Sequence, residues 1–141
     1  MRRCNGDGFT VQLPTAWHNA TSYTLVGPQD EEFCPNVVIK TEPVVGWTDA
    51  RTFAGLQLQT MKTTLSNFRL VAENPASLGM TLGHEVQFAW TDAHNRWLFQ
   101  RQFFCAANGI AYIITCTCLA SQRLRMEASV NAILSSFQFL P

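Results

Sequence analysis

Three histidines and one acidic loop are the first residues to consider for chemistry. His84 lies in an alternating strand pattern between apolar residues, a setting more typical of a hydrogen-bonded core histidine than of a catalytic base. His94 falls in a hairpin loop and His18 in a turn, and no nucleophile signature lies near any of the three. The carboxylates at 30–32 lack EF-hand spacing, and the sequence has no glycine-rich phosphate loop. We therefore expect no enzyme activity and no cofactor.

Five cysteines are present, and this odd number does not indicate a disulfide framework. Cys116 and Cys118 fall on one face of a predicted strand, where they cannot easily bridge each other. They could form a soft-metal pair, but no second Cys/His pair has metal-ligand spacing. The alternative, small thiols in the core, is favoured, and no metal site is predicted.

The 141 residues are enough for one domain, predicted over 1–141, and too few for two comfortable ones. Charged residues make up 14%, below the usual quarter or so, and ten basic side chains balance ten acidic ones. This balance excludes the basic footprint of a nucleic-acid-binding protein, and low charge favours association with a partner or a second copy.

No apolar region typical of a secretion signal follows the opening Met-Arg-Arg-Cys, and no run of 18 apolar residues occurs. We therefore expect a cytoplasmic protein with reduced thiols and no direct membrane insertion.

The segment 96–119 is predicted to be a long β-hairpin at the centre of a sheet, because Asn108-Gly109 separates two runs rich in aromatic and β-branched residues. Both faces of this hairpin are largely apolar, whereas a sheet with one solvated face would alternate more cleanly. The two faces of the first arm are Trp97, Phe99, Phe103 and Cys105 on one side, and Leu98, Gln100, Gln102 and Phe104 on the other. Something should therefore cover the second face.

Two helices are predicted. The first spans 47–68 with Thr48 as N-cap, and its apolar arc of roughly 200° exceeds the 100° or so that docking on a sheet requires. The second spans 121–137 and carries a single narrow apolar stripe. The stripe residues are Met126, Val130, Ile133 and Phe137.

The remaining pattern is strand-like. A hairpin around Asn5-Gly6-Asp7-Gly8 should contain a half-buried strand at 9–13, followed by Trp17 as a core anchor. Further strands are expected at 22–26, 36–41, 69–73 and 80–91, with Asn74-Pro75 in a loop. The order of elements predicts an α+β domain, a curved antiparallel sheet with two main helices packed on it.

Arg101 shares a face with aromatic residues, so its charge must be paired with a carboxylate, reach solvent or lie at an interface. We expect an ion pair with a loop Asp or Glu. Gln100 and Gln102, on the other face, are compatible with water or with donation to the backbone carbonyls of a bound segment.

Several features together resemble one protein family. They are Leu13-Pro14-x-Ala16-Trp17, the pair Arg101-Gln102, the strand IITCTC and a helix near the C-terminus. This combination is similar to the Eag chaperones of type VI secretion, which belong to a DcrB-like group with a PsbP-like α+β fold.

The resemblance implies a cytoplasmic, commonly dimeric chaperone. It would shield the N-terminal transmembrane helices of a PAAR or Rhs-type effector until the effector is loaded on the secretion spike. The implied client-binding groove is floored by the face of the hairpin that includes Gln102 and walled by a strand and the first helix. Its predicted residues are Val38, Gln57, Met61, Leu65, Leu98, Gln100, Gln102, Phe104, Ile113, Thr115 and Thr117.

One segment departs from the family pattern. Aliphatic side chains are expected on the groove face of the strand at 22–25, but Ser22 and Thr24 are in phase with it. Either the register differs or the groove is more polar at that edge. The alternative function is a non-catalytic interaction module of the same fold, with its apolar sheet face buried in a homodimer.

Overall fold

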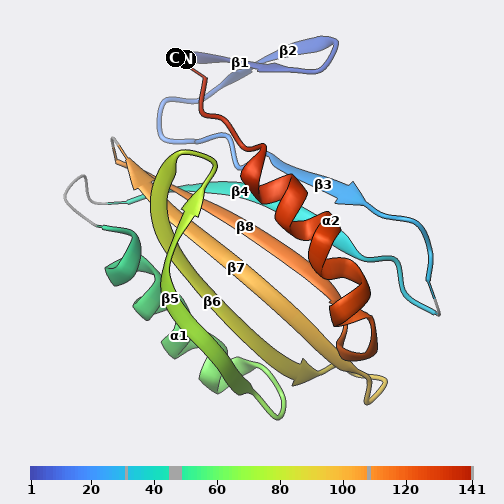
Figure 1. Cartoon of the computed structure of the whole chain (residues 1–141). Coiled ribbons are helices and arrows are strands. Elements are labelled where there is room, and N and C mark those ends of the chain that lie inside the picture. Colours follow the sequence, from blue (N-terminus) through green and yellow to red (C-terminus); the bar gives the residue numbers. More distant parts are fainter. Residues whose placement is uncertain (31, 45–48, 108, 141) are drawn as a thin grey trace.

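The computed structural model describes residues 1–30, 32–44, 49–107 and 109–140. Its main body is a curved, six-stranded antiparallel sheet in the order β3-β4-β8-β7-β6-β5 (Figure 1). The strands are β3 (Ser22–Val26), β4 (Asn36–Pro43), β5 (Arg69–Leu78), β6 (Thr81–Thr91), β7 (Trp97–Ala107) and β8 (Ile110–Leu119). A separate two-stranded sheet pairs β1 (Arg2–Gly6) with β2 (Phe9–Leu13). The predicted α+β class is confirmed.

The predicted central hairpin is β7–β8, paired in continuous register from Leu98 opposite Leu119 to Ala107 opposite Ile110. Gly109 has a φ of 77°, the left-handed conformation that favours glycine at such a turn. Asn108 lies outside the described residues. β4 and β6 flank the hairpin, which places it at the centre of the sheet.

Two helices cover opposite faces of the sheet (Figure 1). α1 (Ala50–Thr64) contacts β6 and β7, and α2 (Arg123–Ser135) contacts β8 and β5. Beneath α1 lies one core cluster, including Val86, Phe88 and Phe104. Beneath α2 lies the other, including Phe103, Ile114 and Leu134. Side chains that alternate along the strands thus contribute to two cores, one on each face, which explains why both faces of the central hairpin are rich in apolar residues.

Both helices are shorter than predicted. Asp49 is the N-cap of α1 and accepts a hydrogen bond from the Thr52 amide at 2.7 Å, while the predicted cap Thr48 lies outside the described residues. The helix ends at Thr64, before Asn67 takes a left-handed φ of 54°. α2 begins at Arg123, after the 3₁₀ turn η1 (Ala120–Gln122), rather than at residue 121.

The prediction that Asn74-Pro75 forms a loop is wrong, because β5 continues through both residues to Leu78. Pro75 pairs with His84 of β6. A proline is tolerated here because β5 is an edge strand, on which one side of the backbone needs no hydrogen-bond donor.

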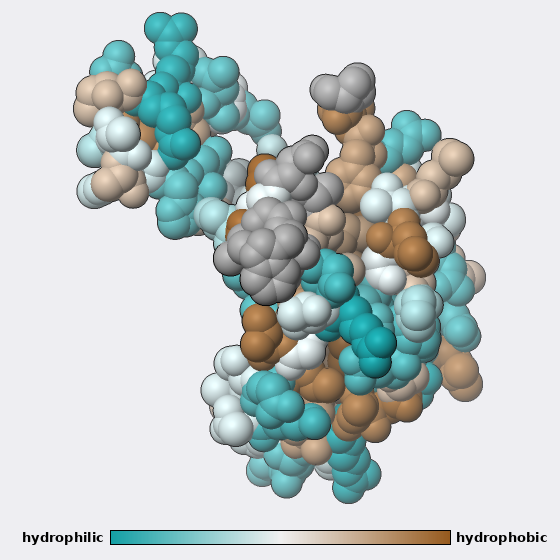
Figure 2. Space-filling view, turned by 90° about the vertical axis from the view of Figure 1, so that its left-hand side faces the viewer, coloured by the Kyte–Doolittle hydropathy of each residue, from teal (hydrophilic) through white to brown (hydrophobic). Residues whose placement is uncertain are grey.

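The N-terminal hairpin stands away from the body of the molecule (Figure 2). Its turn is Asp7-Gly8, with Gly8 at a φ of 77°, so β1 continues through Asn5 and Gly6, which were predicted to belong to the turn. Phe9 and Val11 are exposed, so the prediction of a half-buried strand at 9–13 is wrong. Trp17 is also 64% exposed rather than a core anchor, since its segment links this isolated hairpin to β3. Among the described residues, no helix is long and apolar enough to cross a membrane.

Candidate functional site

Strand pairing brings five of the predicted groove residues together on the face of the sheet that α1 also occupies. Gln100 lies opposite Thr117, and Gln102 lies opposite Thr115. Thr115 in turn lies opposite Val38 of β4. Directly opposed residues of antiparallel strands project from the same face. We call Val38, Gln100, Gln102, Thr115 and Thr117 the amide–hydroxyl strip; all five are half-buried.

The polar groups of the strip are bonded to one another across the strands. The Gln100 amide donates to Thr117 Oγ1 at 2.8 Å, and the Gln102 amide donates to Thr115 Oγ1 at 3.2 Å. Trp90 Nε1 donates to Gln100 Oε1 at 2.8 Å. These cross-strand bonds orient both amides, so the polar groups of the strip form an ordered surface.

Helix α1 covers the adjoining part of this face. Phe104 and Ile113, predicted to floor the groove, are each only 1% exposed in the core that contains Phe53 and Met61. Leu98 is buried as well. Phe104, Ile113 and Met61 do not line an open surface, because the apolar arc of α1 packs directly on the sheet there. Leu98, the fourth buried residue of the predicted site, lies outside that cluster.

The other two residues of the predicted wall, Gln57 on α1 and Leu65 at its C-cap, are half-buried. They have more solvent access than Phe53 and Met61 of α1. Of the eleven predicted residues, the structure therefore leaves seven accessible: five on the sheet, one on α1 and one at the C-cap of α1.

At the far side of the strip, the register of β3 resolves the question left by the sequence. Thr24 lies opposite Val38 and Ser22 opposite Lys40, so both share the face of the strip. Tyr23 therefore projects from the other face. The register does not differ, and the surface is more polar at this edge. Lys40 also forms an exposed ion pair with Glu42, with Nζ 3.7 Å from Oε1.

Of the histidines considered for catalysis, His84 has a structural partner. His84 is 5% exposed, and its Nε2 lies 3.0 Å from Glu73 Oε1, as expected of a hydrogen-bonded core histidine. His94 is exposed in the β6–β7 loop. No group of three or more His, Cys, Asp or Glu side chains within the described ranges could hold a metal ion.

The carboxylate partner of Arg101 lies on the neighbouring strand, whereas the prediction placed it in a loop. Its Nε lies 3.1 Å from Glu85 Oε1 of β6, and its Nη1 donates to Asn131 Oδ1 of α2 at 2.9 Å. The charge therefore lies under α2, on the face opposite the strip.

All five cysteines are free, and three of them, Cys105, Cys116 and Cys118, are buried on the α2 face. Burial raises the pKa of the Cys116 thiol to about 12, because the thiolate loses its hydration there. Burial also raises the pKa values of Cys105 and Cys118. These groups are protonated at neutral pH and are poor nucleophiles.

The sequence reading missed a cavity of about 350 Å³ between α2 and the sheet. Phe99, Arg101 and Cys116 line it from the strands, and Met126 and Val130 line it from α2. The sequence predicted only a narrow apolar stripe on this helix and small thiols in the core. The sequence feature that could have indicated this cavity is the pair Cys116 and Cys118, because small thiols opposite a narrow apolar stripe of a helix leave volume unfilled.

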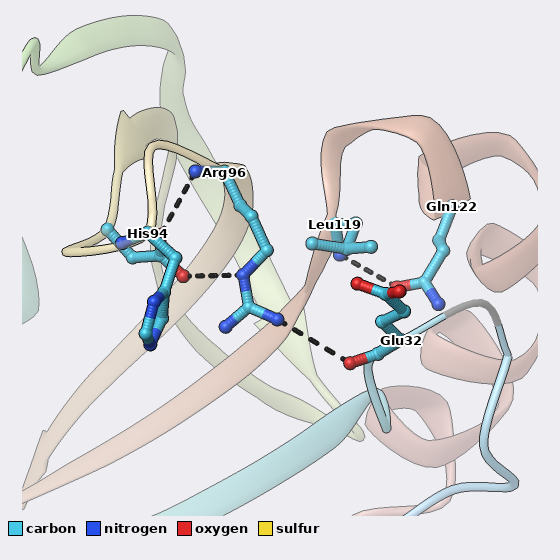
Figure 3. Close-up of polar contacts among 6 residues, drawn as sticks. Glu32, His94, Arg96, Leu119 and Gln122 are labelled. Atoms are coloured by element: carbon cyan, nitrogen blue, oxygen red, sulfur yellow. Dashed lines mark hydrogen bonds and ion pairs between the residues drawn. The ribbon is translucent and has the colours of Figure 1, made fainter.

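The β3–β4 connection at one end of this cavity is held from two sides (Figure 3). Arg96 Nη1 donates to the Glu32 carbonyl at 3.5 Å, and its Nε lies 2.9 Å from Asp92 Oδ2. Gln122, fully buried, accepts from the Leu119 amide at 2.8 Å and donates to the carbonyls of Asp30 and Phe33. The connection is thus tied to the open end of the β7–β8 hairpin, beside the start of β7 and the end of β8.

Comparison with known proteins identifies the family of this chain. A sequence model of the DcrB family matches residues 9–136. The chain belongs to the DcrB family. This agrees with the broader group that the resemblance predicted, whereas membership of the Eag chaperones within it stays a prediction. No curated protein matches the sequence.

Two solved structures are similar to this DcrB-family chain. PA94 of Pseudomonas aeruginosa, described as a protein of unknown function and suggested regulator, has a TM-score of 0.82 at 17% identity, covering 100% of this chain and 98% of that one. LpqN of Mycobacterium tuberculosis, involved in cell envelope biogenesis, has a TM-score of 0.59 at 12% identity, covering 89% of this chain and 88% of that one. At these identities the likeness shows the fold alone.

Proposed function

We propose that this DcrB-family chain is a non-catalytic cytoplasmic chaperone. In this proposal it binds the N-terminal transmembrane helices of a PAAR or Rhs-type effector and shields them before type VI secretion. The observation that carries the proposal is the amide–hydroxyl strip, an ordered surface on the half of the α1 face that α1 leaves uncovered.

The dimensions of the strip suit one helix. It lies on β7, β8 and β4, and Ser22 and Thr24 continue the same face onto β3. Four strands spaced by about 4.8 Å span about 14 Å between the outer two, enough for a helix about 10 Å wide. Because the sheet is curved (Figure 1), such a helix would contact several strands at once.

The chemistry of the strip also suits a transmembrane helix. Within membranes, helices associate through close packing of small residues and through hydrogen bonds from Thr and Gln side chains. Thr115 and Thr117 present methyl groups together with hydroxyls, and Gln100 and Gln102 are already oriented by bonds along the sheet. Leu65 at the edge of α1 adds apolar contact beside them.

The energetic reason for a chaperone is simple. A segment of about 20 apolar residues cannot stay exposed in water without aggregating. Each Å² of apolar surface removed from water contributes about 25 cal/mol, so covering one side of such a helix lowers the free energy of its soluble state substantially.

The test is co-expression with the N-terminal region of a PAAR-domain effector. Gln102→Arg and Thr115→Arg, which place long cations in the strip, should abolish co-purification and leave the effector segment insoluble. Gln59→Arg and Thr60→Arg are the matched controls, because both positions are exposed on α1 away from the sheet, and they should bind like the original chain. Equal thermal unfolding midpoints would show that all four variants fold.

Normal binding by both strip variants would refute the proposed location. Light scattering of the isolated chain addresses the alternative, an interaction module that buries its sheet face in a homodimer. If Gln102→Arg converts a stable dimer into a monomer and no effector segment binds the original chain, the strip is a dimer interface and not a client site.

A further inference from the structure

The cavity beneath α2 lies on the opposite face of the sheet from the strip and needs a separate explanation. Its volume of about 350 Å³ lies within the range of about 300–1,000 Å³ typical of small-molecule sites. Its apolar walls come from β3, β4, β7 and α2. They include Leu25, Val37, Phe99, Met126, Val130 and Ile133.

The cavity exists because α2 packs closely only toward its C-terminal end. There Leu134 is 4% exposed and belongs to the core cluster with Leu78 and Phe103. Toward the N-terminal end, the strand residues that face the helix include the small thiols of Cys116 and Cys118, beside Phe99 and Arg101. Short side chains opposite a half-buried Met126 leave a space that a longer molecule could fill.

The charges around the cavity are unequal. The charge of Arg101 is neutralised by Glu85, whose Oε1 lies 3.1 Å from Arg101 Nε. Arg123, the first residue of α2, stacks over the Phe99 ring at 4.2 Å, and within the described part of the chain no carboxylate oxygen lies within 4 Å of it. Glu127, one turn along α2, also lines the cavity and would oppose a second negative charge.

We propose that this cavity binds a single-chain amphiphile with one anionic head group, of which a fatty acid is the simplest example. The alkyl chain lies along the apolar walls between α2 and the sheet, where its burial drives binding. The head group lies against the Arg123 guanidinium, which offers paired donors to a carboxylate. This site does not depend on the strip and would persist if the chaperone proposal failed.

The test is a titration of the full chain with decanoate, followed by calorimetry and by the methyl NMR signals of Met126, Val130 and Ile133. We expect saturable binding that shifts these three signals. Decanol should bind about tenfold more weakly, because it lacks the charge, and decyltrimethylammonium should not bind. Vesicles containing phosphatidylglycerol distinguish a free amphiphile from a membrane surface, and we expect no binding to them.

Two variants separate the roles of the walls and the head-group site. Val130→Phe fills the cavity and should abolish binding. Leu124→Phe should not change binding, because Leu124 is 83% exposed on the same helix. Arg123→Gln should reduce decanoate affinity about tenfold and leave decanol affinity unchanged. Thermal unfolding verifies that each variant folds. No saturable decanoate binding, or equal binding by Val130→Phe, would overturn the proposal.

Discussion

Arg101 and Glu85 form a two-pronged ion pair between neighbouring strands, with Nε 3.1 Å from Oε1 and Nη2 3.4 Å from Oε2. The two side chains are only 16% and 6% exposed. Burial weakens the competition from water, while the second contact fixes the relative orientation of the two groups. The pair therefore anchors the polar part of an otherwise apolar face beneath α2.

Removing one partner of this pair should be costly. Arg101→Met leaves the Glu85 carboxylate buried without a counter-charge, and we expect the free energy of unfolding to fall by about 3–5 kcal/mol in urea denaturation. The double variant Arg101→Met/Glu85→Met should recover most of the loss, because no uncompensated charge remains. Arg51→Met, at an exposed position on α1, is the control. A single variant as stable as the original chain would show that the pair is not energetically coupled.

Gln122 should act as a clamp between η1, β8 and the β3–β4 connection. Gln122→Glu keeps the oxygen that accepts from the Leu119 amide but removes the donor to the Asp30 and Phe33 carbonyls. We expect a loss of about 1–3 kcal/mol in the free energy of unfolding, with faster hydrogen exchange in the connection. Gln138→Glu, which is exposed, should change neither measurement.

Asp49 should give α1 a pH-dependent stability. The hydrogen bond from the Thr52 amide is the main cause that lowers the pKa of Asp49 below its usual 3.8. A lowered folded-state pKa means that the stabilisation is complete above about pH 4 and disappears as the pH falls through the folded value.

The measurement for Asp49 is the thermal midpoint as a function of pH. Asp49→Ala should lower the midpoint at neutral pH, and the difference from the original chain should shrink in acid. Asp49→Asn keeps a capping oxygen but cannot ionise, so it should retain most of the stability and lose this part of the pH dependence. A constant difference at all pH values would contradict the assignment.

The five thiols should divide into two classes. Cys4 and Cys34 are half-buried, whereas Cys105, Cys116 and Cys118 are buried and their pKa values are raised. Brief alkylation of the native protein at neutral pH should therefore modify Cys4 and Cys34 first, as mapped by mass spectrometry. All five should react in denaturant. Early modification of Cys116 would contradict its buried position.

Much of the central architecture could be predicted from local patterns. Asn108-Gly109 between two β-rich runs predicted the β7–β8 hairpin, and simple alternation correctly placed Gln100 and Gln102 on one face and Arg101 on the other. These predictions succeed because turn chemistry and the two-residue period of a strand are local properties of the chain.

The failures have a different physical origin. Nothing near Trp17 indicates that its segment leads to a hairpin standing outside the core, and nothing near Pro75 indicates that its strand lies at an edge. The partner of Arg101 was sought in a loop, although the β6–β7 register brings Glu85 beside it. Each outcome depends on which segments become neighbours over long sequence separations.

By itself, the sequence determined the α+β class, the identity and phase of the central hairpin and the alternation that feeds two cores. Only the tertiary structure decided that α1 buries Phe104 and Ile113 while leaving the amide–hydroxyl strip open, and that α2 stands over a cavity. The reason is that periodicity fixes which face a side chain occupies, whereas the docking position of each helix fixes which part of that face remains accessible.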